Sequence, residues 1–144
     1  MENLAELKRR LAAVWFADIV GFTRLSSQDE RKALRLVGMF QEMAGREIDR
    51  HEGTLVKFIG DGVLAHAGST ASAIDTALAL RDKFQNQCAA DGEPLFLRIG
   101  VHVGDIVVSH DGDVYGDGVN VASRLHDEAE PGRVVVSEDV WRQS

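Results

Sequence analysis

Apolar and polar positions follow two different rhythms along this chain. Short apolar runs bounded by turn residues are typical of buried strands, whereas apolar residues at every third or fourth position are typical of helices that cover a core. In the run 95–103, strict alternation separates an apolar face from a polar face that carries Arg98 and His102. The short runs predict strands at 11–18, 55–59, 63–66, 95–103, 106–108 and 134–136.

The helical rhythm predicts two long helices and a short one. Ser27 and Glu30 match a capping box, S-x-x-E, that would open the first long helix, and Gly53 would end it. Ser69 would cap the start of the second long helix. The short helix is expected over residues 119–128.

Glycine and aspartate predict the reversals between strands. Gly60-Asp61-Gly62 should join its strands as a tight hairpin, and Gly104-Asp105 should form another. The predicted order is β-α-β-β-α-β-β-α-β, followed by a helical turn from Glu138 onward. Helices mixed with antiparallel hairpins predict an α/β (α+β) domain with a ferredoxin-like βαββαβ sheet. We expect residues 1–10 to form an N-terminal arm and residues 11–144 to form this one domain.

The composition fits a single globular domain and argues against nucleic acid as a partner and against a membrane span. The chain has 144 residues, of which 44% are hydrophobic and 27% charged, ordinary values for a soluble globular protein. Its net charge of −7 and the lack of a basic run argue against nucleic-acid binding. No apolar run approaches the ~20 residues of a membrane span. Cys88 is the only cysteine, so no internal disulfide can form, and we expect a reducing, cytoplasmic setting.

Two aspartates stand at the ends of predicted strands. Asp18 follows the first apolar run, and Asp61 lies in the turn after another. A carboxylate at a strand end is costly to bury unless it is paired or holds a cation, and a glycine such as Gly21 lets backbone amides approach a ligand closely. Each aspartate alone could simply cap a turn. Together they predict a site for divalent metal ions.

Other polar side chains lie at spacings that suit a nucleotide. Lys57 precedes Asp61 by four residues, and an extended strand of that length spans about 13 Å. One end of a nucleotide can hardly use both, so they fit contacts at the base end and the phosphate end, or in two different sites. Asn120 and Arg124 share a face of the short helix. The alternative readings are a solvated lysine for Lys57 and a surface ion pair for Arg124.

Three sequence blocks taken together resemble the class III nucleotidyl cyclases, most closely their bacterial adenylyl cyclase branch. The blocks are FADIVGFT at 16–23, VKFIGDG at 56–62 and GDVYGDGVNVASR at 112–124. Separate blocks in the family's order form a far more specific signal than any one of them. The resemblance extends over residues 10–140, nearly the whole chain.

This resemblance implies an adenylyl cyclase, which converts ATP into 3′,5′-cyclic AMP and pyrophosphate. Asp18 and Asp61, with the backbone carbonyl of Ile19, would hold two divalent ions, Mg²⁺ or Mn²⁺. Lys57 and Asp113 would read the adenine. In-line attack of the ribose 3′-hydroxyl on the α-phosphorus would then depend mainly on positioning and charge stabilisation.

The resemblance also assigns residues to the ribose and the phosphates. Asn120 would orient the ribose, and Arg124 would stabilise the transition state. In the family two protomers pair head to tail, so that one supplies the metal-binding aspartates and the other supplies the remaining side chains; we therefore expect a homodimer. The backbone amides that could cradle the β- and γ-phosphates are those of Val20, Gly21, Phe22 and Thr23.

Two alternatives stay open. A guanylyl cyclase would be expected to carry glutamate and cysteine at the positions of Lys57 and Asp113. A non-catalytic cyclase-homology module usually lacks metal-binding or transition-state residues, which are all present here. Diguanylate cyclases share a similar core, but their GG[DE]EF hairpin is absent. The family's domain usually continues past 134–136 through a further hairpin with a basic phosphate contact, which we expect to be missing from this chain.

Overall fold

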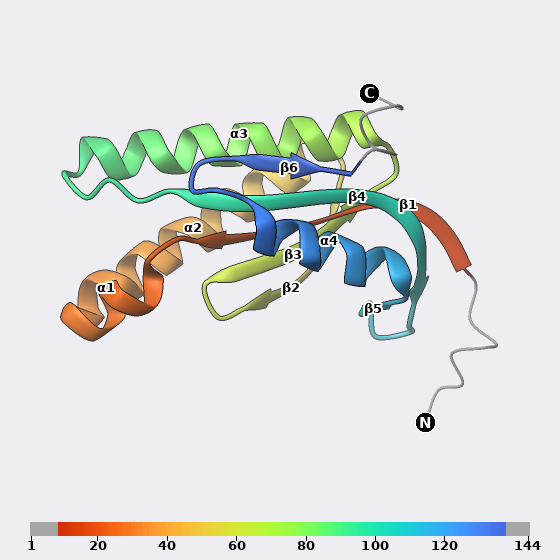
Figure 1. Cartoon of the computed structure of the whole chain (residues 1–144), viewed down its shortest axis with the longest axis horizontal. Coiled ribbons are helices and arrows are strands. Elements are labelled where there is room, and N and C mark those ends of the chain that lie inside the picture. The colour runs from red at the N-terminus through yellow and green to blue at the C-terminus, as the bar shows by residue number, and fades with distance from the viewer. Residues whose placement is uncertain (1–8, 138–144) are drawn as a thin grey trace.

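The computed structural model describes residues 9–137, which form a sheet with helices on both faces (Figure 1). This arrangement confirms the α/β class predicted from the sequence. The elements in chain order are β1 (Arg9–Ile19), α1 (Phe22–Gln28), α2 (Glu30–Arg50), β2 (Thr54–Ile59), β3 (Gly62–Ala67), α3 (Thr70–Ala90), β4 (Leu97–Val108), β5 (Val114–Tyr115), α4 (Asp117–Glu128) and β6 (Val134–Val136).

β1 is the central strand of the sheet. The strand order is β2-β3-β1-β4-β5, and β6 runs parallel to β4. Both neighbours of β1 are antiparallel to it, and β4 pairs with it along its whole length, so that Arg9 lies opposite Val107 and Ile19 opposite Leu97. Because both faces of β1 are covered, the residues 12–15 are all buried instead of alternating with exposed ones.

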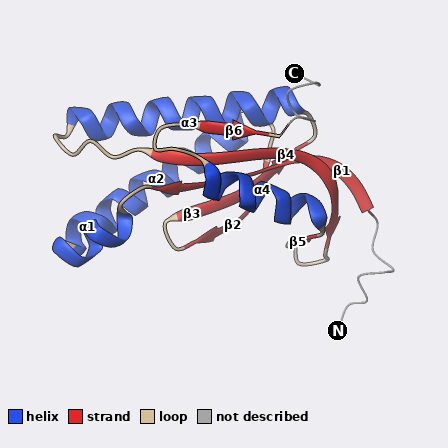
Figure 2. Cartoon of the chain, in the orientation of Figure 1, coloured by secondary structure: helices blue, strands red, loops and turns tan. Residues whose placement is uncertain are grey.

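Separate hydrophobic cores lie on the two faces of the sheet. Trp15 and the other odd-numbered residues from Ala13 to Ile19 face α2 and α3, where Phe40 and Phe84 meet edge to face with their ring centroids 5.7 Å apart. Val14 and other even-numbered residues face α4 in a smaller core. Figure 2 shows α4 in front of the sheet, apart from α2 and α3. Since side chains alternate along a strand, Asp18 also lies on the α4 face.

The first long helix begins differently from the prediction. A separate short helix, α1, precedes it, and α2 begins at Glu30 with Asp29 as its N-cap. The Asp29 side chain accepts a hydrogen bond from the Lys32 amide at 3.1 Å. The predicted capping box of Ser27 and Glu30 is therefore wrong, and the Ser27 hydroxyl donates to a backbone carbonyl inside α1. Aspartate and serine cap helices equally well. The choice of Asp29 over Ser27 therefore depends on the backbone, which is extended at Asp29 (φ −153°).

The predicted hairpin at Gly104-Asp105 is also wrong, because β4 continues through both residues in register with β1. Gly104 serves close packing instead of a turn. A Cβ atom at this position would lie 3.1 Å from the Cα atom of Gly118 at the start of α4. The chain reverses further on, near Gly112, whose φ of +89° favours glycine.

Other local predictions are confirmed. The hairpin at residues 60–62 joins β2 to β3, and the predicted strand at 134–136 is β6. Ser69 caps α3, since its hydroxyl accepts a hydrogen bond from the Ser72 amide at 3.1 Å. The short helix begins at Asp117 instead of residue 119. Each of these confirmed signals acts through only the next few residues of the chain.

Some predictions concern the ends of the chain. The arm predicted for residues 1–10 lies mostly outside the described part, although Arg9 and Arg10 already belong to β1. The helical turn predicted from Glu138 lies wholly outside it. Within residues 9–137, no helix has both the length and the apolar character that crossing a membrane requires.

Candidate active site

The two predicted metal-binding aspartates lie at the same end of neighbouring strands, Asp18 at the end of β1 and Asp61 in the turn between β2 and β3. Asp18 lies opposite Gly62 in the pairing of β1 with β3, so Asp61 is next to the end of β1. The Ile19 amide donates to Asp61 Oδ2 at 3.1 Å and ties the turn to that strand. Gly60 makes the tight turn possible, since its φ of +57° lies in the left-handed region.

Asp18 is held by two basic side chains that the sequence analysis did not assign to the site. Arg98 is its cross-strand neighbour on β4 and binds it through two nitrogens, with Nε 3.2 Å from Oδ1 and Nη2 3.0 Å from Oδ2. His126 on α4 places Nε2 3.0 Å from Oδ2. Burial raises the pKa of the Asp18 carboxyl, but His126 and Arg98 together outweigh burial and hold that pKa below its ordinary value. The Asp18 carboxylate in turn raises the pKa of His126, against the opposing effect of burial.

The pKa of the Asp61 carboxyl is shifted in the opposite direction. Burial raises the pKa of its carboxyl, the Ile19 amide lowers it, and the charge of Asp18 raises it, with a net upward shift. A divalent cation between carboxylates that repel each other would relieve the repulsion, and carboxylate and carbonyl oxygens are the donors that Mg²⁺ and Mn²⁺ prefer. Within residues 9–137 no three His, Cys, Asp or Glu side chains form a metal centre, so nucleotide phosphates would have to complete the coordination.

A pocket of about 340 Å³ opens beside the two aspartates and offers groups that suit a phosphate chain. Phe22 and Thr23 begin α1, where backbone amides have no intrahelical acceptor. The Val20 amide differs, because it donates to the Phe96 carbonyl at 2.8 Å. The pocket is lined by Asp18, Ile19, Val20, Gly21, Phe22, Thr23, Asp61 and Arg98.

Lys57 and Asp113, the predicted base-reading residues, contact each other. Lys57 Nζ donates to Asp113 Oδ2 at 3.0 Å, although these residues lie on β2 and in the loop before β5. The Lys57 side chain is 45% exposed and the Asp113 side chain 27%. A donor and an acceptor are therefore side by side on an accessible surface. Neither lines the 340 Å³ pocket.

A β-bulge in β2 decides which way Lys57 faces. In a regular ladder Lys57 would lie opposite Val63, which belongs to the core under α2 and α3. The register shifts between Leu55 and Lys57, so Lys57 lies opposite Leu64, which belongs to the core under α4. One extra residue thus moves the lysine from the face under α2 and α3 to the α4 face, where it reaches Asp113.

Asn120 and Arg124 are both exposed on α4, one turn apart. Val119 and Ala122 pack against the sheet on the other side of this helix. Neither Asn120 nor Arg124 lines the 340 Å³ pocket. The structure therefore brings Asp18 to Asp61, and Lys57 to Asp113, but it does not bring the α4 pair into the pocket of the aspartates.

Comparison with known proteins decides the family. The model of the adenylate and guanylate cyclase catalytic domain matches residues 7–143. The chain belongs to the class III adenylate and guanylate cyclases. An adenylate cyclase of Streptomyces coelicolor is 39% identical over 132 residues, which cover 91% of this chain and 33% of that protein. The chain spans only 23% to 33% of the length of the first curated relatives that it matches.

Solved structures of cyclases share the fold of this domain. The adenylyl cyclase CyaB of P. aeruginosa superposes with a TM-score of 0.88 at 27% identity, covering 96% of this chain and 82% of that one. An adenylate/guanylate cyclase/hydrolase of Silicibacter pomeroyi superposes with a TM-score of 0.84 at 36% identity, covering 95% and 81%. The cyclase fold expected from the three sequence blocks is thus confirmed.

In this cyclase domain, α4 packs on β4 through glycine. A Cβ atom added at Gly100 would lie 2.3 Å from the amide nitrogen of His126 and 2.8 Å from the carbonyl oxygen of Ala122, which are backbone atoms. We expect Gly100→Ala to displace α4 and to lower the free energy of unfolding by about 1–3 kcal/mol. We also expect slower formation of cyclic nucleotide, because the displaced helix carries Asn120 and Arg124, the residues predicted to act on the ribose and the α-phosphate.

Denaturant unfolding and cyclic-nucleotide formation measured on the same Gly100→Ala preparation test this expectation. Gly38→Ala is a matched control, since an added Cβ at Gly38 in α2 meets nothing within 4 Å and alanine favours a helix. The control should be as stable as the parent or more stable. Unchanged stability and turnover in Gly100→Ala would contradict the close packing of α4 on the sheet.

Proposed function

We propose that this domain is an adenylyl cyclase, which makes 3′,5′-cyclic AMP and pyrophosphate from ATP for cyclic nucleotide signalling. The contact between Lys57 and Asp113, at 3.0 Å, carries the proposal. Adenine offers the complementary groups, because its N1 atom accepts a hydrogen bond and its exocyclic amine donates one. Guanine reverses both polarities and would leave both side chains unpaired. Relatives named adenylate cyclase support the same base choice.

The triphosphate would lie in the pocket beside Asp18 and Asp61. These carboxylates and the Ile19 carbonyl would hold Mg²⁺ or Mn²⁺, and the bound ions would neutralise the phosphates and lower the pKa of the ribose 3′-hydroxyl. The amides of Gly21, Phe22 and Thr23 would cradle the β- and γ-phosphates. Arg98 lines the same pocket, so its guanidinium is well placed to bind phosphate oxygens.

Cyclisation exchanges one phosphorus–oxygen bond for another. The ribose 3′-oxygen bonds to the α-phosphorus while the bond to the bridging oxygen of the β-phosphate breaks, the hydroxyl proton passes to solvent, and pyrophosphate leaves. Arg124 would stabilise the negative charge that develops around the α-phosphorus. Asn120, one turn away on α4, would hold the ribose in position for in-line attack.

Two protomers would build each complete site. The pocket of one chain contains the metal-binding aspartates, whereas the side chains proposed for the base, the ribose and the transition state do not line it. A two-fold axis that sets the pocket of one protomer against these side chains of its partner would create two equivalent sites at one interface. A head-to-tail homodimer is therefore part of the proposal.

The choice between ATP and GTP tests the proposed function. With Mn²⁺ or Mg²⁺ present, we expect kcat/KM for ATP to exceed that for GTP by about 100-fold or more, because the wrong base leaves polar groups unpaired. Chromatographic measurement of cyclic AMP and cyclic GMP gives both values directly.

The double variant Lys57→Glu with Asp113→Cys should erode this preference, since it removes the donor and the acceptor that match adenine. Arg35→Glu, a charge reversal at an exposed position of α2, is the control and should leave the preference intact. Equal kcat/KM for the two nucleotides in the unmutated protein would refute the assignment of ATP as substrate.

A further inference from the structure

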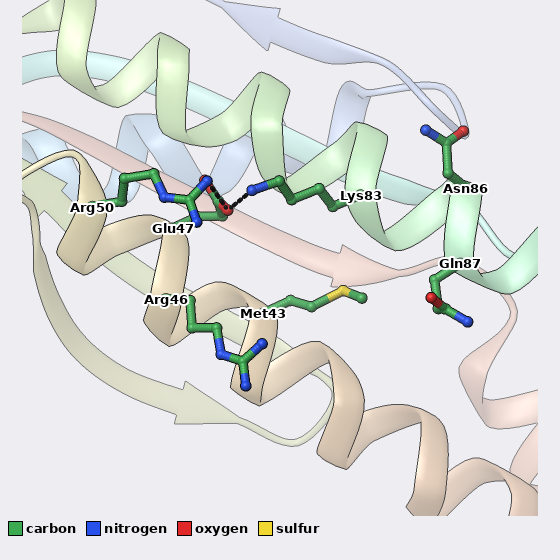
Figure 3. Close-up of a pocket in the computed structure, with 7 residues that line it drawn as sticks. All are labelled: Met43, Arg46, Glu47, Arg50, Lys83, Asn86 and Gln87. Carbon is green, nitrogen blue, oxygen red and sulfur yellow. Dashed lines mark hydrogen bonds and ion pairs between the residues drawn. The ribbon is translucent and has the colours of Figure 1, made fainter.

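A larger pocket lies on the opposite side of the sheet from α4, in the groove between α2 and α3 (Figure 3). Its volume is about 400 Å³. None of its lining residues has a part in the proposed cyclase chemistry. We call it the Glu47 cleft, and its lining residues are Met43, Arg46, Glu47 and Arg50 from α2 and Lys83, Asn86 and Gln87 from α3.

The floor of the Glu47 cleft is a buried carboxylate with one oxygen unsatisfied. The Glu47 side chain is 2% exposed. Lys83 donates to Oε1 from α3, and Arg50 Nη1 lies 3.4 Å from the same oxygen. Oε2 has no hydrogen-bond partner among residues 9–137. The nearby His51 Nδ1 is 3.8 Å from Oε2 but only 2.8 Å from the Glu47 backbone carbonyl oxygen, which is its hydrogen-bond partner.

The rim of the cleft has the opposite charge. Arg46, Arg50 and Lys83 line the cleft together with one carboxylate, so positive charge is in excess among its lining residues. Their side chains are 69%, 61% and 45% exposed, so their charged ends reach solvent and can turn toward a ligand. Figure 3 shows Lys83 and Arg50 meeting at Glu47 from the two helices, while Arg46 points away from it. A matching ligand must carry negative charge for the rim and one hydrogen-bond donor for Glu47 Oε2.

We propose that the Glu47 cleft binds inorganic hydrogen phosphate. Its P–OH group donates to Glu47 Oε2, and its anionic oxygens accept hydrogen bonds from Arg46, Arg50 and Lys83. Sulfate has nearly the same size and charge but carries no proton near neutral pH. It would leave Oε2 unpaired and would place an oxygen lone pair against a carboxylate, both of which are costly. Discrimination between phosphate and sulfate is therefore the signature of this site.

Nuclear magnetic resonance of ¹³C-methyl methionine reads the cleft directly, because Met43 lines it. The titration uses sodium phosphate or sodium sulfate at pH 7 and constant ionic strength, with the Met39 methyl group as an internal reference on the same helix. We expect a saturable shift of the Met43 signal with phosphate. The affinity for sulfate should be weaker by a factor of about ten or more. Absence of a Met43 response, or equal affinity for both anions, would overturn the proposal.

Glu47→Gln separates recognition of the P–OH group from simple attraction to the basic rim. This variant keeps the shape of the side chain but removes its charge, so the preference for phosphate over sulfate should fall to about twofold or less. If the preference persists, Glu47 does not read the proton and the proposal fails. Loss of the ion pair with Lys83 could also unfold this variant, so a second substitution is needed.

Arg46→Gln is that second variant, since Arg46 is exposed and its ion pair with Glu42 lies on the surface. It should weaken phosphate binding at Met43 severalfold, whereas Arg35→Gln, an exposed arginine of the same helix outside the cleft, should not. Equal phosphate affinity in both arginine variants would show that the cleft is only an ion-paired helix contact. Because the readout is the Met43 signal, it is independent of cyclase turnover and of anions bound beside Asp18.

Discussion

Replacing Asp61 with alanine should reduce cyclase turnover by at least about 100-fold, the scale on which electrostatic groups at a reacting centre act. Asp18 alone would leave only one carboxylate to hold the divalent ions, so the negative charge of the triphosphate would stay largely unbalanced. Stability should change little, since Asp61 accepts one hydrogen bond from Ile19 at the end of a turn, a contact worth about 1 kcal/mol.

Formation of cyclic AMP, binding of Mn²⁺ followed by electron paramagnetic resonance, and thermal unfolding together test this expectation. The Mn²⁺ affinity should fall along with turnover, while the unfolding transition stays close to that of the parent. Asp91→Ala is the matched control, because Asp91 also precedes a glycine in a turn but lies at the end of α3. Unchanged turnover in Asp61→Ala would eliminate the two-metal site.

Mixing two inactive variants should restore activity if the sites are shared between chains. In a mixed dimer of Asp18→Ala and Arg124→Ala chains, one site combines the intact aspartates of one chain with the intact arginine of its partner. Each mixed dimer then has one working site of two. Random pairing of equal amounts makes about half of the dimers mixed, so the mixture should reach about a quarter of the parent activity.

Asp18→Ala mixed with Asp61→Ala provides the control, since both substitutions fall in the same half of the site. No pairing of these chains yields a complete set of aspartates, and this mixture should stay inactive. Activity of each mixture is compared with that of the separate variants, and native mass spectrometry counts the mixed dimers. Mixed dimers without any gain in the first mixture would mean that the site is built within one chain.

Much of this domain was predictable from the sequence, because its signals are local. The apolar run before Asp18 predicts a buried strand, and that strand is the centre of the sheet. A turn signal such as Gly60-Asp61-Gly62 and a cap such as Ser69 act through the next few residues only. The three sequence blocks identified the family, which the comparisons confirm. The roles that these blocks suggest for Lys57 and Arg124 stay predictions.

Only the tertiary structure decided the features that depend on which segments meet. Alternation places Arg98 on the polar face of its strand, but the pairing of β4 with β1 is what puts it on Asp18. Gly104 resembles a turn residue, but its pairing with Ala12 of β1 keeps it in a strand, where the missing side chain leaves room for α4. The bulge that turns Lys57 away from the face under α2 and α3 is likewise a product of strand pairing. The physical reason is that strand register and helix packing arise from contacts between residues distant in the chain, which local patterns do not encode.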